Sequence, residues 1–237
     1  MPVFRLSKRL VFPRPELSEE DGLLAVGGDL SPERLVLAYS NGIFPWYDET
    51  SPILWWSPDP RLVFHPEAFR VHRRLARTMR SGKFTWTADT DFNGVIRGCA
   101  ESPRPGQEGT WIIPPMIEAY ERLHELGIAH SIECWCGDGL AGGLYGVGIG
   151  ACFFAESMFS RRTDASKTAM AVLAAQCRRL NIRLIDAQMP TSHLLFMGGE
   201  VMPRADYLGV VSGLARKPAP KGKWRLDGLE LPADAIV

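Results

Sequence analysis

Residues 130–158 read HSIECWC-GDG-LAGGLYGV-GIG-ACFFAESM, and they indicate the architecture of the whole chain. It predicts strands over His130–Cys136, Leu140–Val147 and Ala151–Met158, because each run is rich in residues that favour extended backbone. Three-residue connections that contain glycine separate the runs, and such short connections join antiparallel neighbours. We therefore expect an antiparallel meander at the centre of the fold.

A helix and a further strand follow the meander. Asp164 is expected to cap the N-terminus of a helix over Ala165–Leu180, and Ile182–Gln188 is expected to form a strand. The order of three strands, a helix and a strand resembles that of the acetyltransferase-like (GNAT) α+β fold. In that fold the last two core strands separate and a substrate lies in the gap, although order alone is weak support for any function.

Three polar residues fall near the ends of the last two strands. Alternation along Ala151–Met158 places four side chains on one face: Cys152, Phe154, Glu156 and Met158. Asp186 and Gln188 share a face of the next strand. If the two strands are neighbours, Glu156, Asp186 and Gln188 converge, and a carboxylate that accepts from the Gln188 amide would turn its carbonyl oxygen toward an attacking amine. The same residues could equally form a satisfied polar cluster at a sheet edge.

The chain on the N-terminal side of the meander divides near Pro60. Residues 1–60 are turn-rich and aromatic, with a short helix expected at 34–41 and rigid proline-containing loops after it. In a second helix, expected over Phe69–Lys83, four arginines share one face: Arg70, Arg73, Arg74 and Arg77. That face is either a solvated helix surface or a site for nucleic-acid phosphates. The segment from Lys217 is rich in proline and lysine and is expected to pack loosely.

The composition narrows the class of protein only a little. Basic and acidic residues each number 27, so a nucleic-acid site would have to be a locally basic surface. The five cysteines include no CxxC pair, which favours buried thiols over a metal site. The N-terminus lacks the apolar core of a signal peptide, and no apolar run is long enough to cross a membrane. We expect no metal.

Seven short strings stand out along the chain, four of which contain tryptophan, glycine or proline. Three lie in its first part: GGDLSP at 27–32, GIFPW at 42–46 and WWSPDPR at 55–61. Four follow: GTWI at 109–112, ESMFS at 156–160, ASK at 165–167 and LIDAQ at 184–188. Together and in this order they resemble the signatures of the leucyl/phenylalanyl-tRNA–protein transferases, over roughly residues 12–210.

The resemblance implies an α+β fold in which a small N-terminal domain, residues 1–60, packs on a GNAT-like mixed-sheet domain, residues 61–237. It implies an enzyme, an acyltransferase that moves Leu, Phe and, less well, Met from aminoacyl-tRNA to the N-terminal Arg or Lys of acceptor proteins. In the bacterial cytoplasm this transfer marks the acceptor for degradation by the N-end rule pathway. ATP is consumed when the tRNA is charged, so no cofactor is expected.

The resemblance also assigns roles at the reaction centre, to Glu156, Asp186 and Gln188. Asp186 is expected to polarise Gln188, whose carbonyl oxygen accepts a hydrogen bond from the attacking amine. Glu156 is expected to orient the amine or the basic side chain of the acceptor. Whether these groups relay a proton or only hold the substrates stays open, because aminoacyl esters are reactive and proximity alone accelerates the reaction.

The remaining site residues fall into three groups. Four aromatic residues are expected at the site for the terminal adenosine of the tRNA: Trp46, Trp111, Tyr39 and Tyr120. An apolar pocket for the transferred side chain is expected from Leu144, Phe153, Phe154 and Met158. The tRNA backbone is expected on Arg70, Arg73, Arg74, Arg77, Arg80 and Lys83. The alternative for the tryptophans and the pocket residues is ordinary core packing.

Two other functions compete with this interpretation. A GNAT enzyme that uses acetyl-CoA would need a glycine-containing loop for the pyrophosphate where the helix after the central strand begins. Residues 159–164 at that junction read FSRRTD and contain no glycine. A non-catalytic tRNA-binding module would keep the arginines and tryptophans but would not need the polar residues of the reaction centre.

Overall fold

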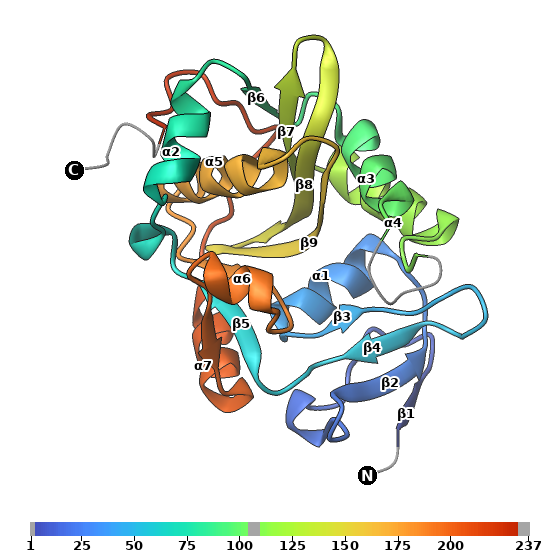
Figure 1. Cartoon of the computed structure of the whole chain (residues 1–237). Coiled ribbons are helices and arrows are strands. Elements are labelled where there is room, and N and C mark those ends of the chain that lie inside the picture. The colour runs from blue at the N-terminus through green and yellow to red at the C-terminus, as the bar shows by residue number, and fades with distance from the viewer. Residues whose placement is uncertain (1–2, 104–109, 232–237) are drawn as a thin grey trace.

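The computed structural model describes residues 3–103 and 110–231, and its strands form two sheets (Figure 1). Gly109 of the fourth string lies outside the described residues. The smaller sheet, in the order β1-β2-β4-β3, comes from the N-terminal region. Its strands are β1 (Phe4–Leu6), β2 (Leu23–Gly27), β3 (Phe44–Pro45) and β4 (Leu54–Trp56). The aromatic segments that were expected to be loops are therefore in part strands, because Phe44 and Trp56 pair across β3 and β4.

The larger sheet has the order β11-β5-β10-β9-β8-β7-β6. Its strands are β5 (Arg61–Phe64), β6 (Thr85–Ala88), β7 (Ala129–Cys136), β8 (Gly139–Ile149), β9 (Cys152–Ser160), β10 (Leu184–Asp186) and β11 (Glu200–Met202). β7, β8 and β9 are antiparallel neighbours, so the meander is confirmed. β10 pairs with β9 in parallel and with β5 antiparallel, which makes the sheet mixed and confirms the α+β class.

Glycine permits the two tight turns of the meander. Gly137, between β7 and β8, has φ 58°, and Gly150, between β8 and β9, has φ 59°. Side chains rarely adopt this left-handed backbone, and at Gly150 a Cβ atom would also lie 2.3 Å from the carbonyl oxygen of Leu214. The sequence pattern that predicted the meander is therefore the pattern that the backbone geometry requires.

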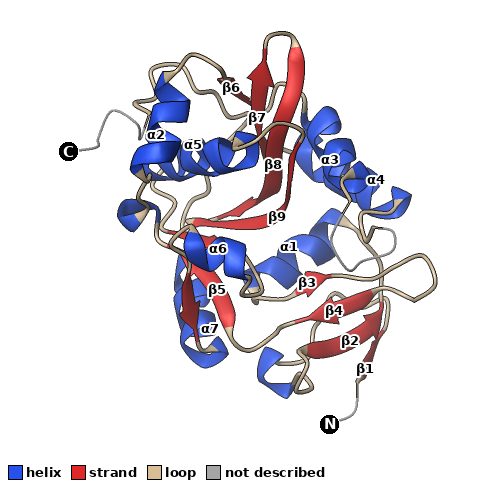
Figure 2. Cartoon of the chain, in the orientation of Figure 1, coloured by secondary structure: helices blue, strands red, loops and turns tan. Residues whose placement is uncertain are grey.

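Helices cover both faces of the larger sheet (Figure 2). They are α1 (Pro32–Ser40), α2 (Arg73–Arg80), α3 (Phe92–Glu101), α4 (Pro114–Glu125), α5 (Ala165–Arg179), α6 (Ser192–Phe196) and α7 (Arg204–Leu214), with short 3-10 helices at Pro15–Leu17 and Pro66–Ala68. One buried cluster joins one face of the sheet to α1, α3, α4, α7 and the smaller sheet, and a second joins the other face to α2 and α5. Two aromatic neighbours on β9 therefore point into different cores: Phe154 into the first and Phe153 into the second.

The basic helix is shorter than the sequence predicted. α2 begins at Arg73 rather than Phe69, and His72 before it has extended backbone with ψ 150°. The extended segment lets Phe69 pack on Phe64 and buries Val71, two contacts that a continuous helix would not make together. Arg70 and Lys83 consequently lie outside the helix.

Two further expectations about the C-terminal half were wrong in detail. The last predicted strand is only Leu184–Asp186, and Gln188 lies beyond it with φ 64°. Asp164 stands at the start of α5 but has left-handed backbone, and its side chain makes no capping hydrogen bond. It pairs instead with Lys167, whose Nζ lies 3.3 Å from Asp164 Oδ1.

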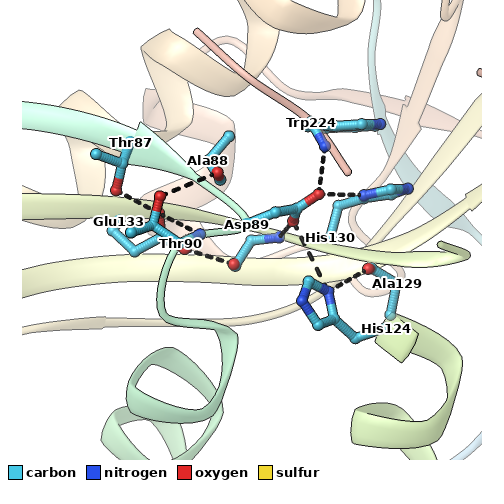
Figure 3. Close-up of polar contacts among 10 residues, drawn as sticks. Thr87, Ala88, Asp89, Thr90, His124, Ala129, His130, Glu133 and Trp224 are labelled. Atoms are coloured by element: carbon cyan, nitrogen blue, oxygen red, sulfur yellow. Dashed lines mark hydrogen bonds and ion pairs between the residues drawn. The ribbon is translucent and has the colours of Figure 1, made fainter. Parts of the chain in front are cut away.

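The segment after Lys217 is anchored, not loosely packed. Its Trp224 is 4% exposed and stacks on the His130 ring, with centroids 4.2 Å apart and planes at 9°. The Trp224 backbone N–H donates to Asp89 Oδ2 at 2.6 Å, and the same carboxylate binds His130 Nδ1 at 2.7 Å and the Ser131 N–H at 2.8 Å (Figure 3). Asp89 therefore ties the C-terminal segment to β7 and to the end of β6.

We predict that Trp224→Ala lowers the free energy of unfolding by about 3–5 kcal/mol, the usual loss for a buried aromatic side chain. Trp224→Phe, which keeps an aromatic ring over His130, should lose less. Urea denaturation measures both, with the exposed neighbour Lys223 changed to alanine as the control. If Trp224→Ala is no more costly than Lys223→Ala, the segment is loosely packed after all.

Candidate active site

A cavity opens where β9 and β10 stop pairing. The two strands are paired from Leu184 and Cys152 to Asp186 and Phe154, and β9 then continues to Ser160 without β10, still paired with β8 on its other side. The cavity has a volume of about 260 Å³. Its walls are Leu144, Ala155, Glu156, Ser157, Met158, Met170, Ala187 and Gln188, with Thr191, His193 and Leu194 from α6 and the residues before it. The gap that the sequence analysis expected between the last two core strands is thus present.

Glu156 occupies a β-bulge in β9. Tyr145 of β8 pairs with Ser157, and the next residue, Gly146, pairs with Ala155, so Glu156 has no partner across the strands. A bulge adds one residue and reverses the alternation beyond it. Met158, expected on the same face as Glu156, consequently packs against the second core, whereas Glu156 is hydrogen-bonded to Tyr120 of the first. Gly146 is required beside the bulge, because a Cβ atom there would lie 2.2 Å from the Phe154 carbonyl oxygen.

The Glu156 carboxylate accepts one hydrogen bond at each oxygen. Gln188 Nε2 donates to Oε1 at 2.9 Å, and the Tyr120 hydroxyl donates to Oε2 at 2.8 Å. The side chain is only 9% exposed, and this burial raises the pKa of Glu156 to about 7 against the opposing effect of the Tyr120 hydrogen bond. Glu156 therefore exchanges its proton near neutral pH, and its ionised form holds the Gln188 amide.

Tyr39 and Tyr120 lie beneath the cavity and do not line it. They are 1% and 0% exposed, and their hydroxyl groups are hydrogen-bonded to each other. Burial, and next the charge of Glu156, raises the pKa of both hydroxyls well above the usual value, so they stay neutral. In this structure the two tyrosines support Glu156 from the core, and their expected contact with the tRNA adenosine stays a prediction.

Asp186 is sealed in an ion pair with Arg61, and both side chains are at most 1% exposed. The Tyr207 hydroxyl donates to Asp186 Oδ2 at 2.6 Å. Asp186 Oδ1 accepts from the backbone N–H of Gln188 at 2.8 Å. The expected contact with the Gln188 side chain is therefore made by Glu156, and Asp186 instead fixes the Gln188 backbone in its left-handed conformation.

Arg61 is a site residue that the sequence analysis missed. Its guanidinium lies 4.9 Å from the Phe44 ring centroid and 4.5 Å from that of Tyr207, and it donates to the Gly42 carbonyl oxygen at 3.3 Å. Two features of the sequence could have indicated Arg61. It ends the WWSPDPR string, and a buried carboxylate such as Asp186 needs a partner of opposite charge. Arg61 joins β5, the N-terminal sheet region and α7 to the site.

The apolar wall contains two of the four residues expected there. Leu144 and Met158 line the cavity, and Met170 of α5 completes it, a residue that no sequence pattern had indicated. Phe153 and Phe154 are 0% and 1% exposed and lie in the two cores. They are therefore core residues, the alternative that the sequence left open.

In the part of the chain that the structure describes, no group of three or more His, Cys, Asp or Glu side chains could hold a metal ion. Among the same residues, no helix combines the length and apolar character needed to cross a bilayer.

Comparison with known proteins then assigns the family. Residues 63–212 match the model described as leucyl/phenylalanyl-tRNA protein transferase, and residues 28–59 match the model of its N-terminal domain. The chain belongs to this family. A protein named leucyl/phenylalanyl-tRNA–protein transferase from Anaeromyxobacter sp. (strain Fw109-5) is 54% identical over 99% of this chain and 100% of its own length. One of the same name from Solidesulfovibrio magneticus is 56% identical over 95% of this chain and 92% of its own.

The resemblance found in the sequence, and the expectation of an aminoacyltransferase, are thereby confirmed. A solved structure from Staphylococcus epidermidis ATCC 12228, described as a functionally unknown conserved protein, has a TM-score of 0.41 at 10% identity and covers 76% of this chain and 68% of its own. That likeness is too low to carry an argument about fold, so the GNAT-like description stays a proposal.

The tryptophans that the family resemblance assigned to adenosine binding lie apart from the cavity walls. Trp46 is half-buried, with its ring centroid 5.5 Å from that of Trp56, whose Nε1 donates to the Trp46 carbonyl oxygen at 2.6 Å. Trp111 is 9% exposed within the first core. Their role stays a prediction.

All six basic residues expected to hold the tRNA backbone are exposed. Along α2, Arg73, Arg77 and Arg80 follow one another at helical spacing, and Arg74 is next to them. None of the six forms an ion pair within the described residues. Their contact with tRNA remains a prediction.

We predict that Glu156→Gln gains stability relative to the unaltered protein as pH rises. The folded-state pKa of Glu156 is raised, so its contribution to stability is fully present below the unfolded value of about 4.5 and is lost as pH rises through about 7. Glutamine does not titrate, and the difference in unfolding free energy should shift in its favour by about 2–3 kcal/mol from pH 5 to pH 8. Urea denaturation across this range checks the shift, with the exposed Glu118→Gln as control. Parallel pH curves for Glu156→Gln and the unaltered protein would contradict the raised pKa.

Proposed function

We propose that the protein transfers Leu or Phe, and less well Met, from aminoacyl-tRNA to the N-terminal Arg or Lys of acceptor proteins. The observation that carries the proposal is the hydrogen bond from Gln188 to Glu156 on the wall of a cavity lined by Leu144, Met158 and Met170. The names of the relatives support the donor class and a protein acceptor.

The reaction exchanges an ester for a peptide bond. The acceptor amine nitrogen bonds to the ester carbonyl carbon, and the bond from that carbon to the ribose oxygen of the tRNA breaks. One proton leaves the attacking nitrogen and one reaches the ribose oxygen. The α-amino group has a reference pKa of about 7.7–8.0, so a large fraction of it is already neutral at physiological pH. The protein's main tasks are to position the two reactants and to exclude water.

Gln188 is the residue best placed to meet the amine. Its amide nitrogen is held by Glu156, which leaves its carbonyl oxygen as an acceptor for an N–H of the attacking group. Glu156 holds the Gln188 amide in this orientation, and each of its oxygens keeps a second lone pair that could also orient the amine. Asp186 acts indirectly, because it accepts a hydrogen bond from the backbone N–H of Gln188.

The cavity walls support a preference for apolar side chains. Leucine, phenylalanine and methionine would each bury apolar surface against Leu144 and the two methionines. Methionine walls adapt to different shapes, and an apolar pocket separates similar side chains by only about 1–3 kcal/mol per methylene group. Relaxed choice among these three follows, and polar side chains are rejected because nothing on the apolar wall replaces their water.

The remaining parts of the proposal concern the fold, the contacts with the tRNA and the fate of the product in the cell. The separation of β9 and β10 supports a GNAT-like arrangement, with a domain boundary near Pro60, where the smaller sheet has ended and β5 begins the larger one. Trp46 and Trp111 are proposed to stack on the terminal adenosine, and the exposed arginines of α2 to bind tRNA phosphates. The product is proposed to enter N-end rule degradation in the cytoplasm.

We predict that the purified protein, given Leu-tRNA and a peptide that begins with Arg, forms a peptide that begins with Leu-Arg. Mass spectrometry of the product checks this, and the same peptide with an acetylated N-terminus is the control that should stay unchanged. Gln188→Ala should lower turnover roughly 10- to 100-fold, because one hydrogen bond to the reacting nitrogen is lost, and should leave the affinity for tRNA unchanged. Activity with acetyl-CoA in place of Leu-tRNA would select the rival acetyltransferase.

We also predict that Arg73→Glu with Arg77→Glu weakens tRNA binding and flattens its dependence on salt. Each lost phosphate contact should reduce the slope of log K against log salt concentration by about one. Filter binding at several salt concentrations measures the slope. The matched control reverses two exposed arginines elsewhere, Arg5 and Arg9. An identical slope in the Arg73 and Arg77 variant would place the tRNA backbone on another surface.

A further inference from the structure

The helix that borders the cavity carries an exposed aromatic ring. Thr191, His193 and Leu194, at the start of α6, line the cavity, and the same helix then exposes Leu195 at 44% and Phe196 at 70%. Met197, which follows, is buried at 7% and anchors the end of the helix. Phe196 therefore lies on the helix that borders the cavity, two residues beyond the lining residue Leu194.

The Phe196 ring also connects the cavity to the basic helix. Its centroid lies 5.8 Å from that of the His72 ring, with the planes at 38°. His72 directly precedes α2, and the next residues, Arg73 and Arg74, are exposed. A single exposed Phe is ordinary on a protein surface. Here it lies between a cavity for an acyl group and a group of cations without acidic partners among the described residues.

This combination fits one kind of occupant. A positively charged surface beside an exposed aromatic ring is how proteins bind single-stranded nucleic acid, because every base has a face that can stack and every nucleotide has a phosphate. An apolar segment of a protein would cover Leu195 and Phe196 but would gain nothing from Arg73 and Arg74. Charge complementarity therefore favours a nucleic acid over a polypeptide.

We propose that Phe196, supported by His72, stacks on one of the unpaired nucleotides that precede the terminal adenosine of the donor tRNA, and that Arg73 and Arg74 bind the adjacent phosphates. The proposal rests on the proposed function and adds a subsite to it. The chain would enter along α2, cross α6 at Phe196 and bring the aminoacyl ester to the cavity that Leu194 borders.

The test compares two donors in Phe196→Ala. Intact Phe-tRNA carries the preceding nucleotides, whereas 3′-O-phenylalanyl adenosine lacks them. The KM for Phe-tRNA should rise roughly 5- to 100-fold, as expected when one stacking contact is lost, with kcat little changed. The KM for phenylalanyl adenosine should not change, and Phe196→Tyr, which keeps the ring, should behave like the unaltered protein. Thermal unfolding confirms that the exposed substitution leaves the fold intact.

Each other outcome overturns the proposal in a recognisable way. An equal loss with both donors means that Phe196 acts on the cavity itself. A rise in the KM of the acceptor peptide alone means that the ring binds the acceptor polypeptide. No change with either donor means that the ring binds neither. An unaltered protein that uses neither donor overturns the proposed function, and this subsite with it.

Discussion

The buried ion pair between Arg61 and Asp186 holds the site together. It joins β5 to β10, and through Tyr207 it includes α7. Burying two charges is costly, and such a pair is favourable only when the remaining donors and acceptors are also satisfied. Here Gly42, Tyr207 and the backbone of Gln188 satisfy them. Through Asp186 the pair thereby fixes the end of β10 and the backbone of Gln188, which lines the cavity.

The polar groups of the site form two layers with separate tasks. Nearest the cavity, Glu156 orients the Gln188 amide. On the core side, the Tyr120 hydroxyl donates to the Glu156 carboxylate and is itself hydrogen-bonded to Tyr39. Asp186 and Arg61 form the second layer, and Asp186 reaches Gln188 through its backbone N–H. Burial, rather than a neighbouring charge, is the main cause of the raised pKa of Glu156, and its value of about 7 lies close to the reference pKa of an α-amine.

Sequence reasoning found the elements whose signals are local. Glycine turns and apolar runs predicted β7, β8 and β9, and the family strings located Glu156, Asp186 and Gln188. The errors arise where contacts are distant in the chain. No residue near Glu156 predicts a bulge, because the bulge depends on how β9 pairs with β8. Simple alternation along the strand therefore assigned Met158 to the wrong face of the sheet. Tyr120, Arg61 and Trp224 find their partners 36, 125 and 135 residues away, a separation that no periodic pattern encodes.

The residues of the cavity wall also indicate which substitutions would change the size and shape of the cavity. Strand β8 contributes only Leu144, and at its neighbour Gly143 a Cβ atom would lie 2.8 Å from the Ile132 carbonyl oxygen, so that strand offers little freedom for redesign. The adjustable surface is Met158 and Met170, whose long unbranched side chains can be shortened without disturbing the backbone. With the cavity as the proposed site of the transferred side chain, shortening these residues is expected to admit larger rings from that side, on the face opposite the tyrosines.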